Sequence, residues 1–240
     1  MNRWSRPPDR LPTLEDTVHI WLLELEDAGF HPAVWQNRLS AQERARATRL
    51  RPKKDRRRFT LSHAGLRDII GRYVMKTAAD TLQFALGPNG KPKLAPPFDA
   101  AGVQFNLSHS YERAVIAVNH AHEIGIDIEF ARTEFEFLEV ARRFFTTREV
   151  RALRALPTAL QRQAFYKCWT SKEAFLKAKG TGLAGALDEV GIALDNDHVR
   201  IEASVPGWCL TTLDLPAGYE AALVTRNKPM KICRYRWQAG

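Results

Sequence analysis

The first regular element that the hydrophobic pattern predicts is a buried strand. Thr17–Leu25 (TVHIWLLEL) is rich in apolar and β-prone residues and is long enough for a strand. Ser40 and Glu43 then form an S-x-x-E capping box, which predicts the start of a short helix. Pro52 predicts the end of that helix, and Asp55 is placed to cap a second one.

This second helix carries an apolar face, because side chains suited to burial recur at steps of three and four residues. The pattern predicts that the helix packs on a sheet; the face consists of Phe59, Ser62, Leu66, Ile70 and Tyr73. A turn-rich stretch, Gly87–Pro92, follows the helix. Two further strands are predicted at Val103–Leu107 and Ala114–Val118.

The second half of the chain repeats this order of elements. It opens with a strand at Glu123–Phe130 (EIGIDIEF), and Gly180 is placed to end the last of its helices. The helices are predicted at Glu136–Phe145, Thr147–Leu156 and Thr158–Lys179, and the closing strands at Val199–Ala203, Cys209–Leu213, Ala221–Thr225 and Ile232–Trp237. The order indicates an α+β fold of two similar halves, residues 1–120 and 121–240, although no residue-level repeat is visible.

Composition is typical of a folded protein, since 45% of the 240 residues are hydrophobic and 26% are charged. No apolar run approaches the roughly 20 residues of a membrane-spanning helix. Met1–Arg10 lacks the apolar centre of a secretory signal. The three cysteines, Cys168, Cys209 and Cys233, lie far apart, which favours a reducing compartment over a disulfide framework. We therefore expect a cytoplasmic protein that does not associate with a membrane.

The net charge of +9 is concentrated in one segment. Between Arg38 and Arg58 there are ten Lys or Arg residues, against only Glu43 and Asp55. A solvated face is the ordinary explanation of a basic stretch. This density also suits an anionic partner, which could be nucleic acid, a membrane surface or a phosphate-rich small molecule.

The pentad Gly125–Glu129 (GIDIE) is a candidate metal site. The two-residue period of a strand places Asp127 and Glu129 on one face and the two isoleucines on the other. Adjacent carboxylates repel, and an oxygen-rich pair of this kind suits Mg²⁺. A strand edge with solvated acids would show the same pattern, so the pentad alone leaves both interpretations open.

A second candidate lies in Trp169–Lys177 (WTSKEAFLK), where Glu173 and Lys177 share one face of a helix. A surface ion pair would look the same. Trp169 lies one turn earlier on that face, which indicates that the face is not simply solvated. A carboxylate and an ammonium beside a metal suit phosphoryl chemistry, with Glu173 as metal ligand or base and Lys177 neutralising phosphate oxygens.

Two further segments carry polar groups that could meet a phosphate. Asn106–Ser110 (NLSHS) ends a predicted strand in hydroxyl and imidazole groups, although a lone histidine such as His109 is more often structural. Gly90, Lys91 and Pro92 would be a plain turn with an exposed lysine if they stood alone.

Together these segments resemble one family. The order G-K-P, N-L-S-H-S, G-I-D-I-E and W-T-S-K-E-A-F-L-K is similar to the motif series of the 4'-phosphopantetheinyl transferase superfamily, surfactin-synthetase-activating (Sfp) type. Arg142–Thr146 (RRFFT) also matches the segment between the last two motifs, and the resemblance spans Ser40 to Leu183.

The resemblance implies roles for individual residues. Asp127, Glu129 and Glu173 fall on the family's Mg²⁺ ligands, and Lys177 on its lysine near the reacting phosphate, so the catalytic set is Asp127, Glu173 and Lys177. The implied coenzyme A contacts are Lys91 with Pro92 near the pyrophosphate, Ser108 and His109 at the nucleotide end, and Arg46 and Arg58 near the 3'-phosphate.

The resemblance also implies a fold and a reaction. It predicts two similar α+β halves with coenzyme A in the cleft between them, the first contributing to coenzyme A binding and the second carrying the metal-binding acids. The predicted reaction moves phosphopantetheine from coenzyme A to a serine of an apo carrier protein and releases 3',5'-ADP. We expect a monomer that binds no nucleic acid. The alternatives are a basic nucleic-acid-binding protein and a metal-dependent nuclease.

Overall fold

The computed structural model divides into two compact units. It describes residues 4–26, 32–74, 78–87, 89–182, 192–194, 201–203 and 205–238. The first unit comprises Met1–Gly87, Pro92–Ala121 and Met230–Gly240, and the second comprises Pro88–Lys91 and His122–Pro229. The sequence suggested a single boundary after residue 120. The units differ from it because the last strand of the chain belongs to the first unit and a short turn that includes Lys91 belongs to the second.

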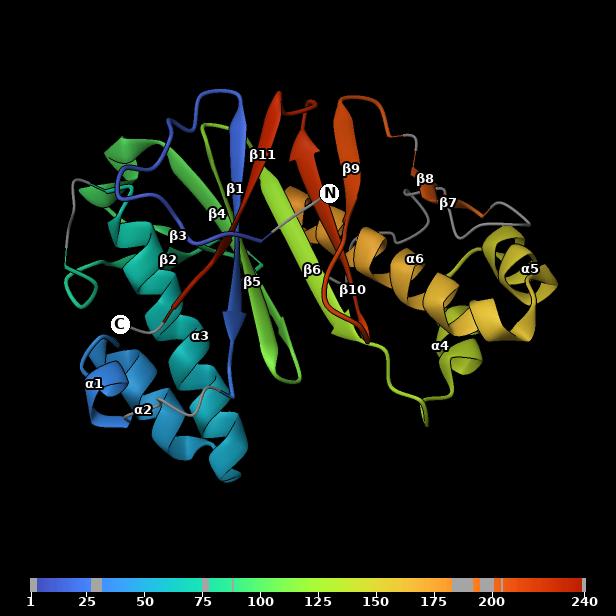
Figure 1. Cartoon of the computed structure of the whole chain (residues 1–240), viewed down its shortest axis with the longest axis horizontal. Coiled ribbons are helices and arrows are strands. Elements are labelled where there is room, and N and C mark those ends of the chain that lie inside the picture. Colours follow the sequence, from blue (N-terminus) through green and yellow to red (C-terminus); the bar gives the residue numbers. More distant parts are fainter. Residues whose placement is uncertain are drawn as a thin grey trace. The chain divides into compact units, whose positions relative to one another are not determined.

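A four-stranded sheet forms the centre of the first unit, in the order β11-β1-β5-β4 (Figure 1). These strands are β1 (Thr17–Glu24), β4 (Val103–Ser110), β5 (Arg113–His120) and β11 (Lys231–Arg236). The β1–β11 pair is parallel and the other two pairs are antiparallel. Strand β1 lies inside the sheet and is buried from Val18 to Leu23, which explains why its sequence is an almost continuous apolar run.

The α-helices in the described part of this unit are α1 (Pro32–Gln36), α2 (Ala41–Arg49) and α3 (Lys53–Gly71). The predicted capping box is confirmed, since Ser40 Oγ accepts from Glu43 N and Glu43 Oε2 accepts from Ser40 N. The predicted cap at Asp55 is wrong. Helix α3 begins at Lys53, three residues earlier than a cap at Asp55 would give, and the N-cap is Pro52, whose backbone is extended, so Asp55 lies within the first turn.

Helix α3 packs on the sheet, as its apolar face predicted. Leu66 and Ile70 of the predicted face join Trp21 and Leu23 of β1 in one buried cluster. The cluster also contains residues of α3 that the predicted face did not include, namely Leu61, Ala64 and Ile69. The remaining elements are a hairpin of β2 (Phe84–Leu86) and β3 (Pro92–Leu94) and a short 3₁₀ helix, η1 (Phe98–Ala101). They were not predicted, because three or four residues are too few to show a period.

The second unit has a three-stranded antiparallel sheet in the order β6-β10-β9. Its strands are β6 (Ile124–Phe130), β9 (Trp208–Leu213) and β10 (Tyr219–Arg226), and β7 (Ile192–Leu194) pairs separately with β8 (Ile201–Ala203). The long helix α6 (Thr158–Lys179) packs on β6 and β10 (Figure 1). Its bounds match the prediction, and Gly180 ends it with φ +70°, a left-handed conformation that favours glycine.

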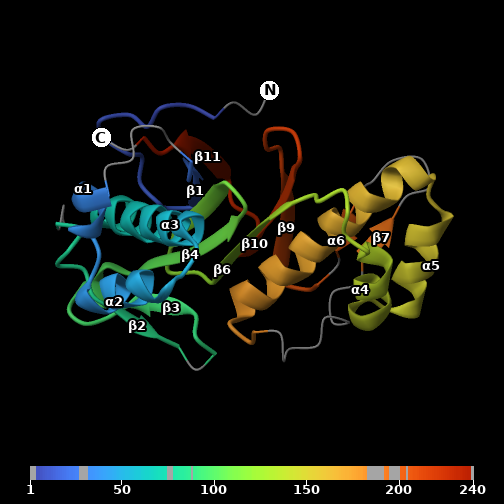
Figure 2. The same ribbon diagram turned by 90° about the horizontal axis from the view of Figure 1, so that it is seen from below.

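Two shorter helices, α4 (Phe137–Phe144) and α5 (Thr147–Ala155), contact α6 near its beginning (Figure 2). Thr146 and Glu149 form a second capping box at the start of α5. The predicted α+β fold class is therefore confirmed, with helices and sheets in each unit. The first part of the predicted strand Val199–Ala203 lies outside the described residues. The cleft expected between the halves stays a prediction. None of the described helices is long and apolar enough to cross a bilayer.

Candidate active site

A glycine brings strand β6 and helix α6 into direct backbone contact. A Cβ atom at Gly125 would collide with the carbonyl oxygen of Ala174 and the backbone nitrogen of Ala178. These are backbone atoms of a long helix, so they cannot move aside as a side chain can. The contact places Asp127, two residues along β6, beside the face of α6 that carries Glu173 and Lys177.

Asp127 is the most buried of the candidate acids, with 3% of its surface exposed. Its Oδ1 atom accepts a charged hydrogen bond from Lys177 Nζ at 2.6 Å, and the lysine side chain is partly exposed. A buried carboxylate needs such a partner, because an unpaired buried charge is strongly destabilising. Asp127 is therefore not one of the solvated acids that a plain strand edge would carry, whereas Glu129 is half-buried.

Glu173 lies close enough to Asp127 and Lys177 for their charges to shift its pKa. Burial, followed by the negative charge of Asp127, raises the pKa of Glu173, while Lys177 opposes the rise. Its Oε1 atom is buried and has no hydrogen-bond partner among the described residues. The ammonium of Lys177 therefore acts on two carboxylates, Asp127 and Glu173.

The chemistry of these side chains fits a hard divalent cation such as Mg²⁺, which prefers carboxylate oxygens. The buried, unbonded oxygen of Glu173 next to Asp127 is the observation that supports this fit. Across the described residues, however, no group of three His, Cys, Asp or Glu side chains is gathered closely enough to hold a metal. Asp127 and Glu173 come together, and Glu129 does not complete a three-ligand cluster with them.

Glu129 has neighbours that the sequence did not single out. Glu220 of β10 lies directly opposite it in the antiparallel register, and burial raises the pKa of Glu220. A cavity of about 170 Å³ borders Glu129, with aromatic side chains that include Tyr166 and Trp169 in its wall. Trp169 is half-buried against Phe144 and Phe165, which agrees with the expectation that its helix face is not simply solvated.

A buried ion pair lies next to Glu173 in sequence. Lys172 Nζ is 2.9 Å from Glu149 Oε1, and both side chains are almost completely buried. Glu149 belongs to the capping box of α5, so the pair ties the start of α5 to the middle of α6. The sequence motif contains Lys172, but nothing local indicated its partner 23 residues earlier.

Lys91 belongs to the second unit and does not have the exposed position of a lysine in a plain turn. Its ammonium donates to the carbonyl oxygens of Ile124, at 2.8 Å, and Ala178, at 3.3 Å. Burial lowers its pKa to about 8. Pro92, its neighbour, begins β3 in the first unit.

The first unit holds the remaining predicted ligand contacts. Arg46 of α2 lies over the ring of Phe59, which stacks on His63 at 3.8 Å between centroids. Burial is the main cause that lowers the pKa of His63 to about 4, and the positive fields of His109 and Arg46 act in the same direction. Arg46 and His109 therefore lie around one neutral imidazole, a residue that sequence reasoning missed because it follows no motif.

The other predicted contacts of this unit differ in exposure. Arg58 pairs with Glu26 at 3.0 Å and lies over the ring of Tyr111. Ser108 and His109 are neighbours on β4, where alternation buries Ser108 and exposes His109 on the opposite face. The two residues therefore do not face a ligand from the same side of the strand.

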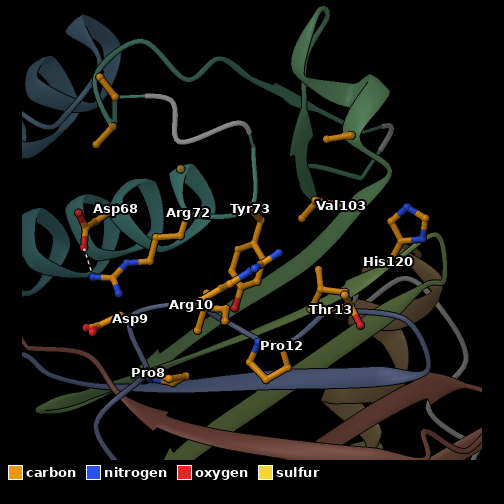
Figure 3. A pocket seen from close by; sticks show the side chains of 16 residues that line it. Pro8, Asp9, Arg10, Pro12, Thr13, Asp68, Arg72, Tyr73, Val103 and His120 are labelled. Carbon is orange, nitrogen blue, oxygen red and sulfur yellow. Dashed lines mark hydrogen bonds and ion pairs between the residues drawn. The ribbon is translucent and has the colours of Figure 1, made fainter.

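The first unit also contains a cavity of about 1110 Å³ whose wall includes none of the predicted site residues (Figure 3). The N-terminal segment 8–14, the end of α3 and His120 line it. Its acidic and basic side chains are partly paired, because Asp68 binds both Arg38 and Arg72. Nothing in this lining assigns a charged ligand to the cavity.

Comparison with known proteins identifies the family. The family model described as the 4'-phosphopantetheinyl transferase superfamily matches residues 123–224. Over 88% of its length the chain is 38% identical to the 4'-phosphopantetheinyl transferase HetI of Nostoc sp., covering 88% of that protein. The chain belongs to the 4'-phosphopantetheinyl transferase superfamily.

Two further transferases of this superfamily are similar. The 4'-phosphopantetheinyl transferase psf-1 of Bacillus pumilus is 32% identical over 87% of the chain and 88% of the relative. The 4'-phosphopantetheinyl transferase Sfp of Bacillus subtilis is 32% identical over 77% of the chain and 81% of the relative. The family assignment inferred from the motifs is therefore confirmed. Members of the family use coenzyme A and act on carrier proteins.

Proposed function

We propose that this protein transfers the 4'-phosphopantetheine arm of coenzyme A to a serine of an apo carrier protein. Asp127 and Glu173, with Glu129 as the resemblance implies, would hold the Mg²⁺ that the reaction uses. The serine hydroxyl attacks the β-phosphorus of the diphosphate, and the bond from that phosphorus to the bridging oxygen breaks. 3',5'-ADP leaves with the bridging oxygen, and the serine proton passes to a base.

The observation that carries the proposal is the meeting of Asp127, Glu173 and Lys177. They come from two motifs about 50 residues apart, and the backbone contact at Gly125 holds their elements together. Membership of the transferase family supplies the reaction to which this arrangement applies.

Lys177 and Glu173 have separate tasks in this proposal. The ammonium of Lys177 donates to Asp127 and can donate to a phosphate oxygen as well, because an ammonium carries three protons. Glu173 takes the serine proton. In the metal-free protein, burial and the charge of Asp127 raise the pKa of Glu173, which favours uptake of a proton.

Held at these carboxylates, Mg²⁺ would supply positive charge to offset the negative charge of the reacting diphosphate. Asp127 and Glu173 provide the buried oxygens, and Glu129 is the third ligand that the family resemblance implies.

The basic residues of the first unit bind the nucleotide end of coenzyme A. Arg46 and His109 lie around His63, and Arg58 lies beside Tyr111, so cationic and aromatic groups occur together in both places. This combination suits a phosphorylated nucleotide, whose phosphates attract the guanidinium groups and whose base stacks on aromatic rings.

Intact-mass spectrometry of apo carrier proteins, incubated with this protein, coenzyme A and Mg²⁺, tests the proposal. We expect the carrier to gain the mass of one phosphopantetheine arm, and a serine-to-alanine carrier to gain nothing. Carriers from several pathways that all stay unmodified, together with tight binding or cleavage of DNA or RNA, would favour the alternatives and contradict the proposal.

A further inference from the structure

The short segment that joins β2 to β3 satisfies three carbonyl groups of the second unit. Asn89 Nδ2 donates to Gly180 O at 2.7 Å. Lys91 Nζ donates to Ala178 O at 3.3 Å and to Ile124 O at 2.8 Å. The first two carbonyls belong to the last turn of α6 and its C-cap, and the third belongs to the first residue of β6.

Two of these hydrogen bonds are made to carbonyl groups at the carboxy-terminal end of α6. The last four carbonyls of an α-helix have no partner within the helix, and the carboxy-terminal end of the helix dipole attracts a cation. The carbonyl of Leu176 already accepts from the backbone of Gly180 and Thr181. The side chain of Lys91 serves the carbonyl of Ala178, which that backbone arrangement does not serve.

Lys91 forms hydrogen bonds to both β6 and α6, the two elements that carry the candidate active site. Ile124 precedes Gly125, and Ala178 is one of the two residues that Gly125 contacts, so the ammonium joins β6 and α6 beside that backbone contact. Asp127 follows Ile124 by three residues, and Lys177 directly precedes Ala178. A change in the spacing at this point would move Lys177 relative to Asp127.

We propose that Lys91 is a positioning residue that holds the last turn of α6 against β6, and so fixes Lys177 beside Asp127. The ammonium makes hydrogen bonds to two carbonyl oxygens, and among the described residues no carboxylate lies within ion-pair distance of it. This role differs from the contact with the coenzyme A pyrophosphate that the resemblance implied. The activity part of the test rests on the proposed transferase function, and the structural part does not.

Lys91→Met tests the inference, because methionine preserves much of the chain length and removes the three donors. The matched control is Lys93→Met, since Lys93 is exposed on β3 two residues away. Hydrogen–deuterium exchange followed by mass spectrometry measures the last turn of α6 and β6 without any substrate. We expect exchange there to be about tenfold faster in Lys91→Met than in the wild type, and unchanged in Lys93→Met.

Steady-state kinetics supply a reading that a purely structural role would not change. We expect Lys91→Met to lower kcat about tenfold while the KM for coenzyme A stays within about threefold. Lys91→Arg, which retains a cation and several donors, should recover part of kcat. A higher KM with unchanged exchange in α6 would assign Lys91 to coenzyme A and overturn the inference. Unchanged kcat and KM with only a lower melting temperature would overturn it too.

A second variant keeps the inference testable if Lys91→Met does not fold. Asn89→Ala removes only the hydrogen bond to Gly180 O. Faster exchange confined to the end of α6 would support the inference that this segment holds the helix end, and unchanged exchange would contradict it. If the wild type modifies no carrier protein, the proposed function fails, whereas the exchange comparison still decides whether Lys91 and Asn89 hold the end of α6.

Discussion

The two units both pack a long helix on a sheet through a glycine, but the glycine lies in different places. In the first unit Gly65 belongs to helix α3, and a Cβ atom there would meet the end of the Leu23 side chain. In the second unit Gly125 belongs to strand β6, and a Cβ atom would meet the backbone of α6. The first contact can adjust and the second cannot. The fixed contact is the one beside the candidate catalytic residues.

The charged residues that we assign to the substrate also differ between the two units. Buried Asp127 pairs with partly exposed Lys177, and Glu173 lies beside them with a raised pKa. Arg46 of the first unit is exposed and lies over the face of the Phe59 ring. We infer a division of labour, in which the second unit acts on the reacting phosphates and the first binds the remote end of the substrate.

The largest expected effect tests the difference between the two glycines. Gly125→Ala should lower the melting temperature by about 10 °C or more, or prevent folding of the second unit, because helix backbone would have to move. Gly65→Ala should change it by only a few degrees, since Leu23 can rotate and alanine favours the helix. Calorimetry of both variants measures this, and equal shifts would contradict the distinction.

A smaller effect concerns acid stability. Burial, with help from Lys231, lowers the pKa of His19 to about 4, below the value of about 6.5 in an unfolded chain. The folded first unit therefore binds fewer protons than the unfolded chain between these pH values, and it loses up to about 3 kcal/mol of stability as the pH falls from 6.5 to 4. Protonation of Glu173 changes stability in the opposite direction. Because its pKa is raised, the folded state binds this proton more readily than the unfolded chain and gains stability as the pH falls.

Hydrogen exchange resolved by peptide measures this difference between the units. On acidification, protection should be lost in β1 before it is lost in α6, and His19→Gln should reduce the loss in β1. Simultaneous loss in both elements, unaffected by His19→Gln, would contradict the assignment of the effect to His19.

The smallest expected effect concerns binding by the first unit. Arg46→Ala should raise the KM for coenzyme A about tenfold and leave kcat within a few-fold, because the nucleotide end has the same contacts in the ground state and the transition state. Arg49→Ala is the control, since it removes the same charge from the same helix, whereas Arg46 is the residue that lies over the ring of Phe59. If both variants raise KM equally, general charge attraction explains the effect and the specific contact is refuted.

Local patterns predicted much of this structure. The bounds of α6 follow from its composition and from Gly180, and the alternation in β6 gave the shared face of Asp127 and Glu129. The capping box at Ser40 was also readable, because its hydrogen bonds join residues three positions apart.

Contacts between distant residues were not readable in the same way. Nothing near Gly125 showed that helix backbone would press against it, and nothing near Lys91 indicated carbonyl partners at Ile124 and Ala178. The parallel pairing of β11 with β1 is equally hidden, since it joins the two ends of the chain. Such pairings depend on the whole fold, and a single sequence carries no local signal for them.

The most direct test of the division of labour is the turnover of Asp127→Asn at saturating coenzyme A and Mg²⁺, measured by the mass gain of an apo carrier protein. Asparagine keeps the shape of the side chain and removes its charge. The variant must first show the melting temperature and exchange pattern of a folded protein. We predict that kcat falls about a thousandfold, because the lost carboxylate acts at the reacting phosphates. A folded Asp127→Asn protein with near-normal kcat would contradict the account.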